Sequence, residues 1–127
     1  MPKYNAQLII PALICAGAVA LAADPVLTVS PKEPGSLKGN LAPGKEGSWT
    51  VVIKNGKEAR LVVVKGQREI SFDVYDSQNI AANEGVSDGD WFPVEAGQYK
   101  VTITNVTNLG KKSGGHDVAY EIKLEVK

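Results

Sequence analysis

The chain has 127 residues, of which 43% are hydrophobic and 22% are charged. This length suits one domain rather than two, and this composition excludes disorder of the whole chain. Fourteen basic and fourteen acidic residues cancel, so the charge provides no electrostatic footprint for nucleic acid or an anionic membrane.

The first 23 residues are typical of a secretory signal peptide. Lys3 supplies a positive charge, residues 8–23 are all apolar or small, and small-x-small patterns end that run. We predict cleavage after Ala22 or Ala23, and therefore a periplasmic or secreted protein. A transmembrane anchor is the alternative, but the apolar run is short for a membrane span and contains Pro11.

Cys15 is the only cysteine, and it lies in the middle of that apolar run. A lipoprotein signal would require a small residue before the cysteine, whereas Ile14 is large. Removal of residues 1–23 would leave a single domain, residues 24–127, with thirteen basic and fourteen acidic residues and a net charge of −1. That domain would contain no disulfide, no thiolate metal site and no thiol nucleophile.

The first half of the predicted domain consists of short strands separated by turn residues. Residues 26–29 favour a strand, and residues 36–41 favour a weak edge strand. Residues 48–53 alternate as a strand, and Asn55-Gly56 then predicts a hairpin that leads to a return strand at 60–65. The unbroken apolar run of the return strand predicts burial on both of its faces.

The second half alternates more cleanly. Residues 70–75 place Ile70, Phe72 and Val74 on one face, and an irregular polar loop follows at 77–90. Two further alternating strands are predicted at 98–105 and 118–126.

Strands with turn signals every eight to twelve residues predict an all-β protein. We expect an antiparallel, jelly-roll-like β-sandwich of about seven or eight strands. The predicted core consists of alternating inward-facing residues, namely Trp49, Val51, Ile53, Leu61, Val63, Ile70, Phe72, Val74, Tyr99, Val101, Ile103, Tyr120, Ile122 and Leu124.

The chain from Trp49 onward resembles the bacterial pre-peptidase C-terminal domain, a small β-sandwich appended to secreted proteases and other exported enzymes. The likeness lies in three stretches, Phe72 to Asp76, Gly97 to Ile103 and Tyr120 to Leu124. The resemblance implies a free-standing relative of jelly-roll type. Only Glu69 and Asp73 stand where that family has an acidic motif.

The irregular loop and its flanks are rich in side-chain oxygens, which calcium requires in numbers of six to eight. If calcium binds here, we expect Asp73, Asp76, Asp88 and Asp90 to be its ligands. The alternative is an ordinary acidic surface loop, because the register of an EF-hand is absent. No other cofactor is expected.

Three aromatic residues are candidate ligand-binding positions. Tyr75 faces away from the core if Phe72 faces into it, and Trp91 and Phe92 follow the polar loop. An exposed aromatic ring there would provide a platform for a sugar or a protein side chain. The alternative is that Trp91 or Phe92 caps one end of the core, as large aromatic residues usually do.

His116 is the only histidine. A catalytic triad could be assembled on paper from Ser113, His116 and Asp117, but the three residues share one loop and strand start, without a strained elbow or an oxyanion-hole sequence. We therefore predict that the protein is not an enzyme and that His116 is an ordinary surface residue.

These observations favour an exported, non-catalytic binding or accessory module that contacts protein or polysaccharide through its loops and exposed aromatic residues. Two alternatives stay open. One is a structural subunit of an envelope assembly, held by edge-strand pairing. The other is a calcium-stabilised domain of a secreted system. We expect no nucleic-acid partner and no membrane span in the mature chain.

Overall fold

The computed structural model describes residues 24–83, 87–109 and 114–127. These residues contain no helix of the length and hydrophobicity needed to cross a membrane. The prediction of an all-β protein is confirmed. The eight strands are β1 (Val26–Val29), β2 (Gly35–Leu41), β3 (Glu46–Ile53), β4 (Glu58–Lys65), β5 (Ile70–Tyr75), β6 (Phe92–Pro93), β7 (Gly97–Asn105) and β8 (Val118–Val126).

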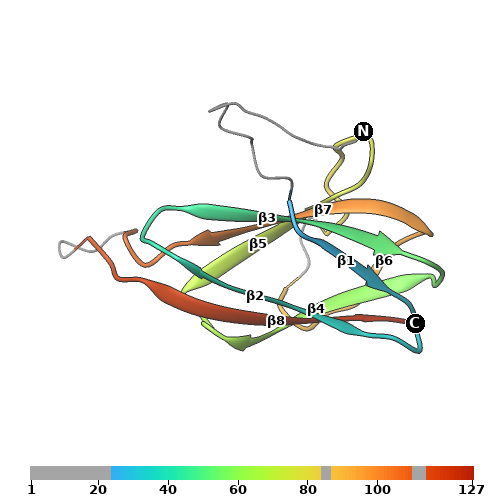
Figure 1. The fold of residues 1–127 in the computed structure, drawn as a ribbon, viewed down its shortest axis with the longest axis horizontal. Helices are drawn as coiled ribbons and strands as arrows, with labels where there is room; N and C mark the ends of the chain where they lie inside the picture. The colour runs from blue at the N-terminus through green and yellow to red at the C-terminus, as the bar shows by residue number, and fades with distance from the viewer. Residues whose placement is uncertain (1–23, 84–86, 110–113) are drawn as a thin grey trace, which may run out of the picture.

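The strands form two four-stranded sheets that pack face to face (Figure 1). One sheet has the order β1-β3-β7-β5 and is called the odd sheet; the other has the order β2-β8-β4-β6 and is called the even sheet. All pairs are antiparallel except β1 with β3, which is parallel. Each strand therefore lies in the other sheet from the strand before it, and every connection crosses the sandwich.

The core lies between the inner faces of the two sheets. Alternate residues of β7 and β8 point into it, and Ile103 and Ile122 are completely buried. The whole predicted core belongs to this cluster or packs against it, although Trp49 and Phe72 are only partly buried. Burial of one large apolar side chain contributes about 1.5–3 kcal/mol.

The hairpin predicted at Asn55-Gly56 is wrong. β3 lies in the odd sheet and β4 in the even sheet, so the two strands do not pair. Gly56 is nevertheless required, because its φ is 128° and an added Cβ would clash with Val126 at the end of β8. The turn signal is thus real, but it serves a crossing between sheets.

The predicted burial of both faces of β4 is also wrong. Leu61 and Val63 point into the core, whereas Val62 is half-buried and Val64 is 45% exposed on the outer face. By contrast, the weak strand predicted at 36–41 does lie at an edge, as β2. Residues 70–75 form β5, which is the edge strand of the odd sheet.

Candidate functional site

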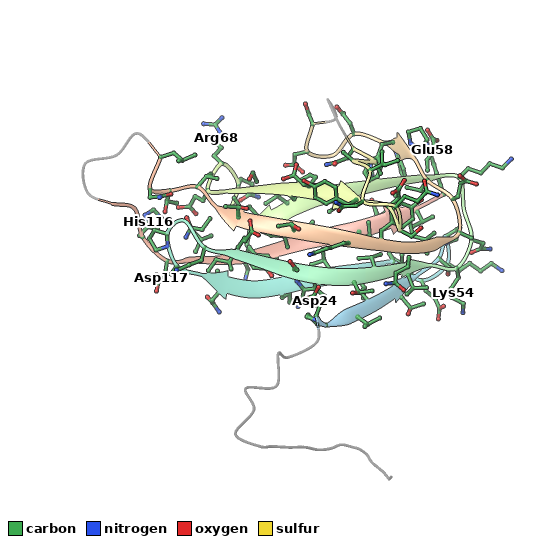
Figure 2. All side chains as sticks on the ribbon, turned by 90° about the horizontal axis from the view of Figure 1, so that it is seen from above. Asp24, Lys54, Glu58, Arg68, His116 and Asp117 are labelled. Carbon is green, nitrogen blue, oxygen red and sulfur yellow. The ribbon has the colours of Figure 1, made fainter. Side chains whose placement is uncertain are left out.

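Three connections meet at one end of the sandwich. They join β2 to β3, β4 to β5 and β7 to β8, and we call their described residues (42–45, 66–69, 106–109 and 114–117) the loop end. Figure 2 shows Arg68 and His116 at this end, while Lys54 and Glu58 lie at the opposite end. The two ends therefore carry charged side chains that can be varied independently.

Asn105, the last residue of β7, holds the loop end together. Its side chain is completely buried, and its Nδ2 donates hydrogen bonds to the carbonyl oxygens of Leu41 (2.8 Å) and His116 (2.9 Å). Its Oδ1 accepts from the backbone N–H (2.9 Å) and the hydroxyl (2.7 Å) of Thr107. Its backbone N–H donates to the carbonyl oxygen of Lys45 at 2.9 Å. Because every polar atom of the amide is satisfied, the connections are fixed before any partner binds.

The β4–β5 connection is a tight turn with an unusual residue in it. Glu69 donates its backbone N–H to the carbonyl of Gly66 at 2.9 Å, which closes the turn. Arg68 lies inside it with a φ of 68°, in the left-handed region that usually holds glycine or asparagine. An arginine there costs about 1–2 kcal/mol of backbone strain. Its side chain is exposed and projects from the loop end (Figure 2).

His116 links the β7–β8 connection, in which it lies, to the β4–β5 connection. Its Nε2 lies 2.5 Å from Oε2 of Glu69, and both side chains are partly exposed. The backbone of Val106 also donates to the carbonyl of Glu69 at 2.9 Å. Ser113, which would supply the nucleophile of a triad with His116 and Asp117, lies outside the described residues. In the described residues, the histidine therefore serves to join the β4–β5 and β7–β8 connections.

The structure separates the three candidate aromatic residues. Phe92 is 2% exposed and belongs to the core, so its ring is not accessible to a ligand. Trp91 is half-exposed; the guanidinium of Arg60 lies 4.7 Å and the ammonium of Lys127 4.3 Å from its ring centroid. These are cation–π contacts, which place the indole on the outer face of the even sheet. Tyr75 is half-buried on the outer face of the odd sheet.

The four candidate calcium ligands do not form one cluster. Asp88 accepts a hydrogen bond from the backbone of Val63 at 2.9 Å, and Asp76 accepts from two backbone N–H groups of its own loop. Asp73 and Asp90 are exposed. Over the described ranges, no three acidic, histidine or cysteine residues are placed to hold a metal ion. Calcium binding stays a prediction, which a thermal melt with and without a chelator would test.

Asp76 does line a groove on the outer face of the odd sheet, of about 340 Å³. We call it the outer-face groove, and its polar lining includes Thr50, Asp76, Ser77, Asn79, Gln98 and Lys100. A second hollow of about 270 Å³ adjoins it and shares Asp76, Ser77, Gln98 and Tyr99. The sequence predicted Asp76 as a site residue, but neither Asn79 nor Lys100.

Two residues that matter for the loop end, one in it and one next to it, were also missed. Asn105 continues the inward-facing positions of Tyr99, Val101 and Ile103, and a polar residue at such a position was an available signal. Arg68 has no signal in the sequence, because only the backbone conformation makes it unusual.

No family model matches the chain, and no curated protein matches it. The solved structures that share its fold include three PliG proteins. PliG of Salmonella Typhimurium has a TM-score of 0.56 and 11% identity, with 81% of this chain and 99% of that chain covered. PliG of Aeromonas hydrophila has a TM-score of 0.53 and 20% identity, with 83% and 100% covered.

The third structure is a mutant of PliG from Escherichia coli. It has a TM-score of 0.56 and 12% identity, with 83% of this chain and 100% of that chain covered. All three proteins are described as periplasmic lysozyme inhibitors of g-type lysozyme. At these identities the likeness establishes the fold. The resemblance to the pre-peptidase C-terminal domain stays a prediction.

Proposed function

We propose that the protein is an exported, non-catalytic binding protein that contacts a lysozyme-class enzyme and inhibits it. The fold supports this proposal, because the chain covers 99–100% of three proteins described as inhibitors of g-type lysozyme. The predicted signal peptide supports an envelope location.

The observation that carries the proposal is the strained, exposed Arg68 on a rigid loop end. Arginine is among the residues most enriched at the energetic centres of protein interfaces. Asn105 and the contact between His116 and Glu69 order the connections in advance, so binding would lose little conformational entropy. A backbone strain kept at an exposed tip favours a role in contact with a partner.

The chemistry of the partner fits a guanidinium. Glycoside hydrolases generally use two carboxyl groups that flank the scissile bond. A planar guanidinium forms bidentate hydrogen bonds with a carboxylate and stays charged at any relevant pH. Arg68 would thus compete with the substrate for the acidic groups of the enzyme's cleft.

The test combines activity with affinity. The purified protein is added to a g-type lysozyme and to lysozymes of other types, and clearing of a peptidoglycan suspension and calorimetric affinity are measured. We expect inhibition of the g-type enzyme with a Kd of about 1 μM or tighter, equivalent to roughly −8 kcal/mol. Unchanged activity of every lysozyme at saturating protein would contradict the proposal.

A further inference from the structure

The outer faces of the two sheets differ in their chemistry. On the even sheet, charged side chains neutralise one another: Arg60 and Lys123 lie 2.7 Å and 3.3 Å from Glu125, and Lys38 lies 4.0 Å from Glu121. Trp91 is also engaged on this face, by Arg60. This face therefore has few free groups with which to bind a ligand.

The outer face of the odd sheet is rich in hydroxyl groups. The strand register aligns Thr50 with Lys100 and Lys100 with Tyr75, and it aligns Thr102 with Asp73 in the next row. Between the described residues of this face there is no ion pair. Its hydroxyl-bearing side chains include Ser48, Thr50, Ser71, Thr102 and Thr104.

The outer-face groove lies at the end of β5, on this hydroxyl-rich face. Its volume of about 340 Å³ is within the range of ligand pockets, roughly 300–1,000 Å³. Thr50 and Lys100 provide its floor from β3 and β7, and Ser77 and Asn79 line it from the loop that follows β5. The adjoining hollow continues the same surface toward Glu95.

The wall of the groove is already ordered. Oδ1 of Asp76 accepts hydrogen bonds from the backbone N–H groups of Gln78 and Ile80, both at 2.9 Å. Asn79 lies between them with a φ of 63°, a conformation that asparagine tolerates. Farther along, the buried Asn83 accepts from the backbone of Val74 at 3.0 Å. A ligand would therefore meet a preformed wall.

We propose that the outer-face groove binds a neutral oligosaccharide. Sugar hydroxyls donate and accept at the same time; the amides and hydroxyls of the lining can also do both, while its carboxylates accept and its ammonium donates. The predicted cleavage would leave an α-ammonium at residue 23 or 24; with Lys100 it balances Asp24 and Asp76, so the charge of the groove favours a neutral ligand. Tyr75, beside Lys100 in the register, adds aromatic surface for the apolar face of a sugar.

This site is separate from the loop end and does not rest on the proposed inhibition. It is tested by titrating the ¹⁵N-labelled protein with tetrasaccharides of N-acetylglucosamine, β-linked glucose and α-linked glucose. We expect at least one probe to shift the amide resonances of Thr50, Asn79 and Lys100, with those of Arg68 unmoved. The proposal is overturned if none of the three probes shifts these resonances at millimolar concentrations.

A double variant, Asn79→Gly with Lys100→Ala, tests the contacts. Glycine accepts the positive φ of position 79, so the loop keeps its shape while the amide is lost. We expect affinity for the binding probe to fall about tenfold, the effect of losing hydrogen bonds worth roughly 1.4 kcal/mol.

The matched control is Lys123→Ala, which removes a lysine from the outer face of the even sheet. It should bind the probe as tightly as the unaltered protein. If the double variant unfolds, Asn79→Gly alone provides the measurement. Equal affinity of the groove variant and the control would overturn the assignment.

Discussion

Arg68 occupies a backbone conformation in which glycine would be the less costly residue. We expect Arg68→Gly to raise the free energy of unfolding by about 0.5–1 kcal/mol, because the relief of strain exceeds the added freedom of the unfolded chain. The same variant should weaken lysozyme inhibition at least tenfold, through loss of the guanidinium. Urea unfolding and the peptidoglycan assay measure the two effects on one preparation.

Lys54→Ala is the matched control, because Lys54 is an exposed cation at the opposite end of the sandwich (Figure 2). It should change the free energy of unfolding by less than about 0.5 kcal/mol and leave inhibition unchanged. If Arg68→Gly inhibits the lysozyme as strongly as the unaltered protein does, Arg68 is not part of the contact surface. That result would not contradict inhibition by the unaltered protein.

For substitution of Asn105 we predict the opposite effect, a large loss of stability. Asn105→Ala would leave the carbonyl of Leu41 and the backbone N–H of Thr107 without their partner in a buried place. We expect the free energy of unfolding to fall by about 2–4 kcal/mol, since each orphaned buried group costs about 1–3 kcal/mol. Asn108→Ala, at an exposed position of the same connection, should cost less than about 0.5 kcal/mol. Similar losses of stability in the two variants would contradict the role of Asn105 in holding the loop end together.

At the scale of elements, β4 and β8 are joined by charge as well as by their backbones. The hydrogen bond from Arg60 to Glu125, followed by that from Lys123, lowers the pKa of the Glu125 carboxyl from its usual 4.5. A carboxyl with a lowered folded-state pKa stabilises the protein above its ordinary pKa. That contribution is lost as the pH falls through the lowered value.

Arg60→Gln should therefore reduce stability more at about pH 7 than at about pH 3. Urea unfolding of both proteins at the two pH values measures the difference. Part of the stability loss caused by Arg60→Gln should remain in acid, because Arg60 contacts Trp91 whether or not Glu125 is protonated. A stability difference that does not change with pH would show that the pair makes no ionic contribution.

The strands themselves could be predicted because a period of two residues marks one buried face, as in β5, β7 and β8. Their partners could not be predicted in the same way. Asn55-Gly56 satisfies the local requirements of a hairpin and of a crossing between sheets alike, and the choice depends on β7 and β8, which come much later in the chain. Site prediction had the same limit: Asp76 was visible as a polar residue, whereas Lys100 joins it only through the pairing of β5 with β7.

At the scale of the whole molecule, the alternation of strands between sheets makes each sheet depend on the other. Among the described strands, none pairs with its neighbour in the chain, so every pairing requires the closure of a long loop. Proteins dominated by such distant pairings fold in roughly milliseconds to seconds. Because successive strands belong to different sheets, we expect the two sheets to form in one cooperative step.

The two tryptophans report on different parts of the sandwich. Trp49 lies on β3 of the odd sheet and donates its indole N–H to the hydroxyl of Tyr120 on β8 at 3.0 Å, so it reports on the packing of the two sheets against each other. Trp91 lies against Arg60 on the outer face of the even sheet. Trp91→Phe and Trp49→Phe leave one probe each, and stopped-flow fluorescence measures refolding of both variants. Corrected for the stability of each variant, the two rate constants should agree, and the two urea transitions should each be two-state. A faster phase seen only through Trp91 would mean that the even sheet forms alone, which the crossing of every connection argues against.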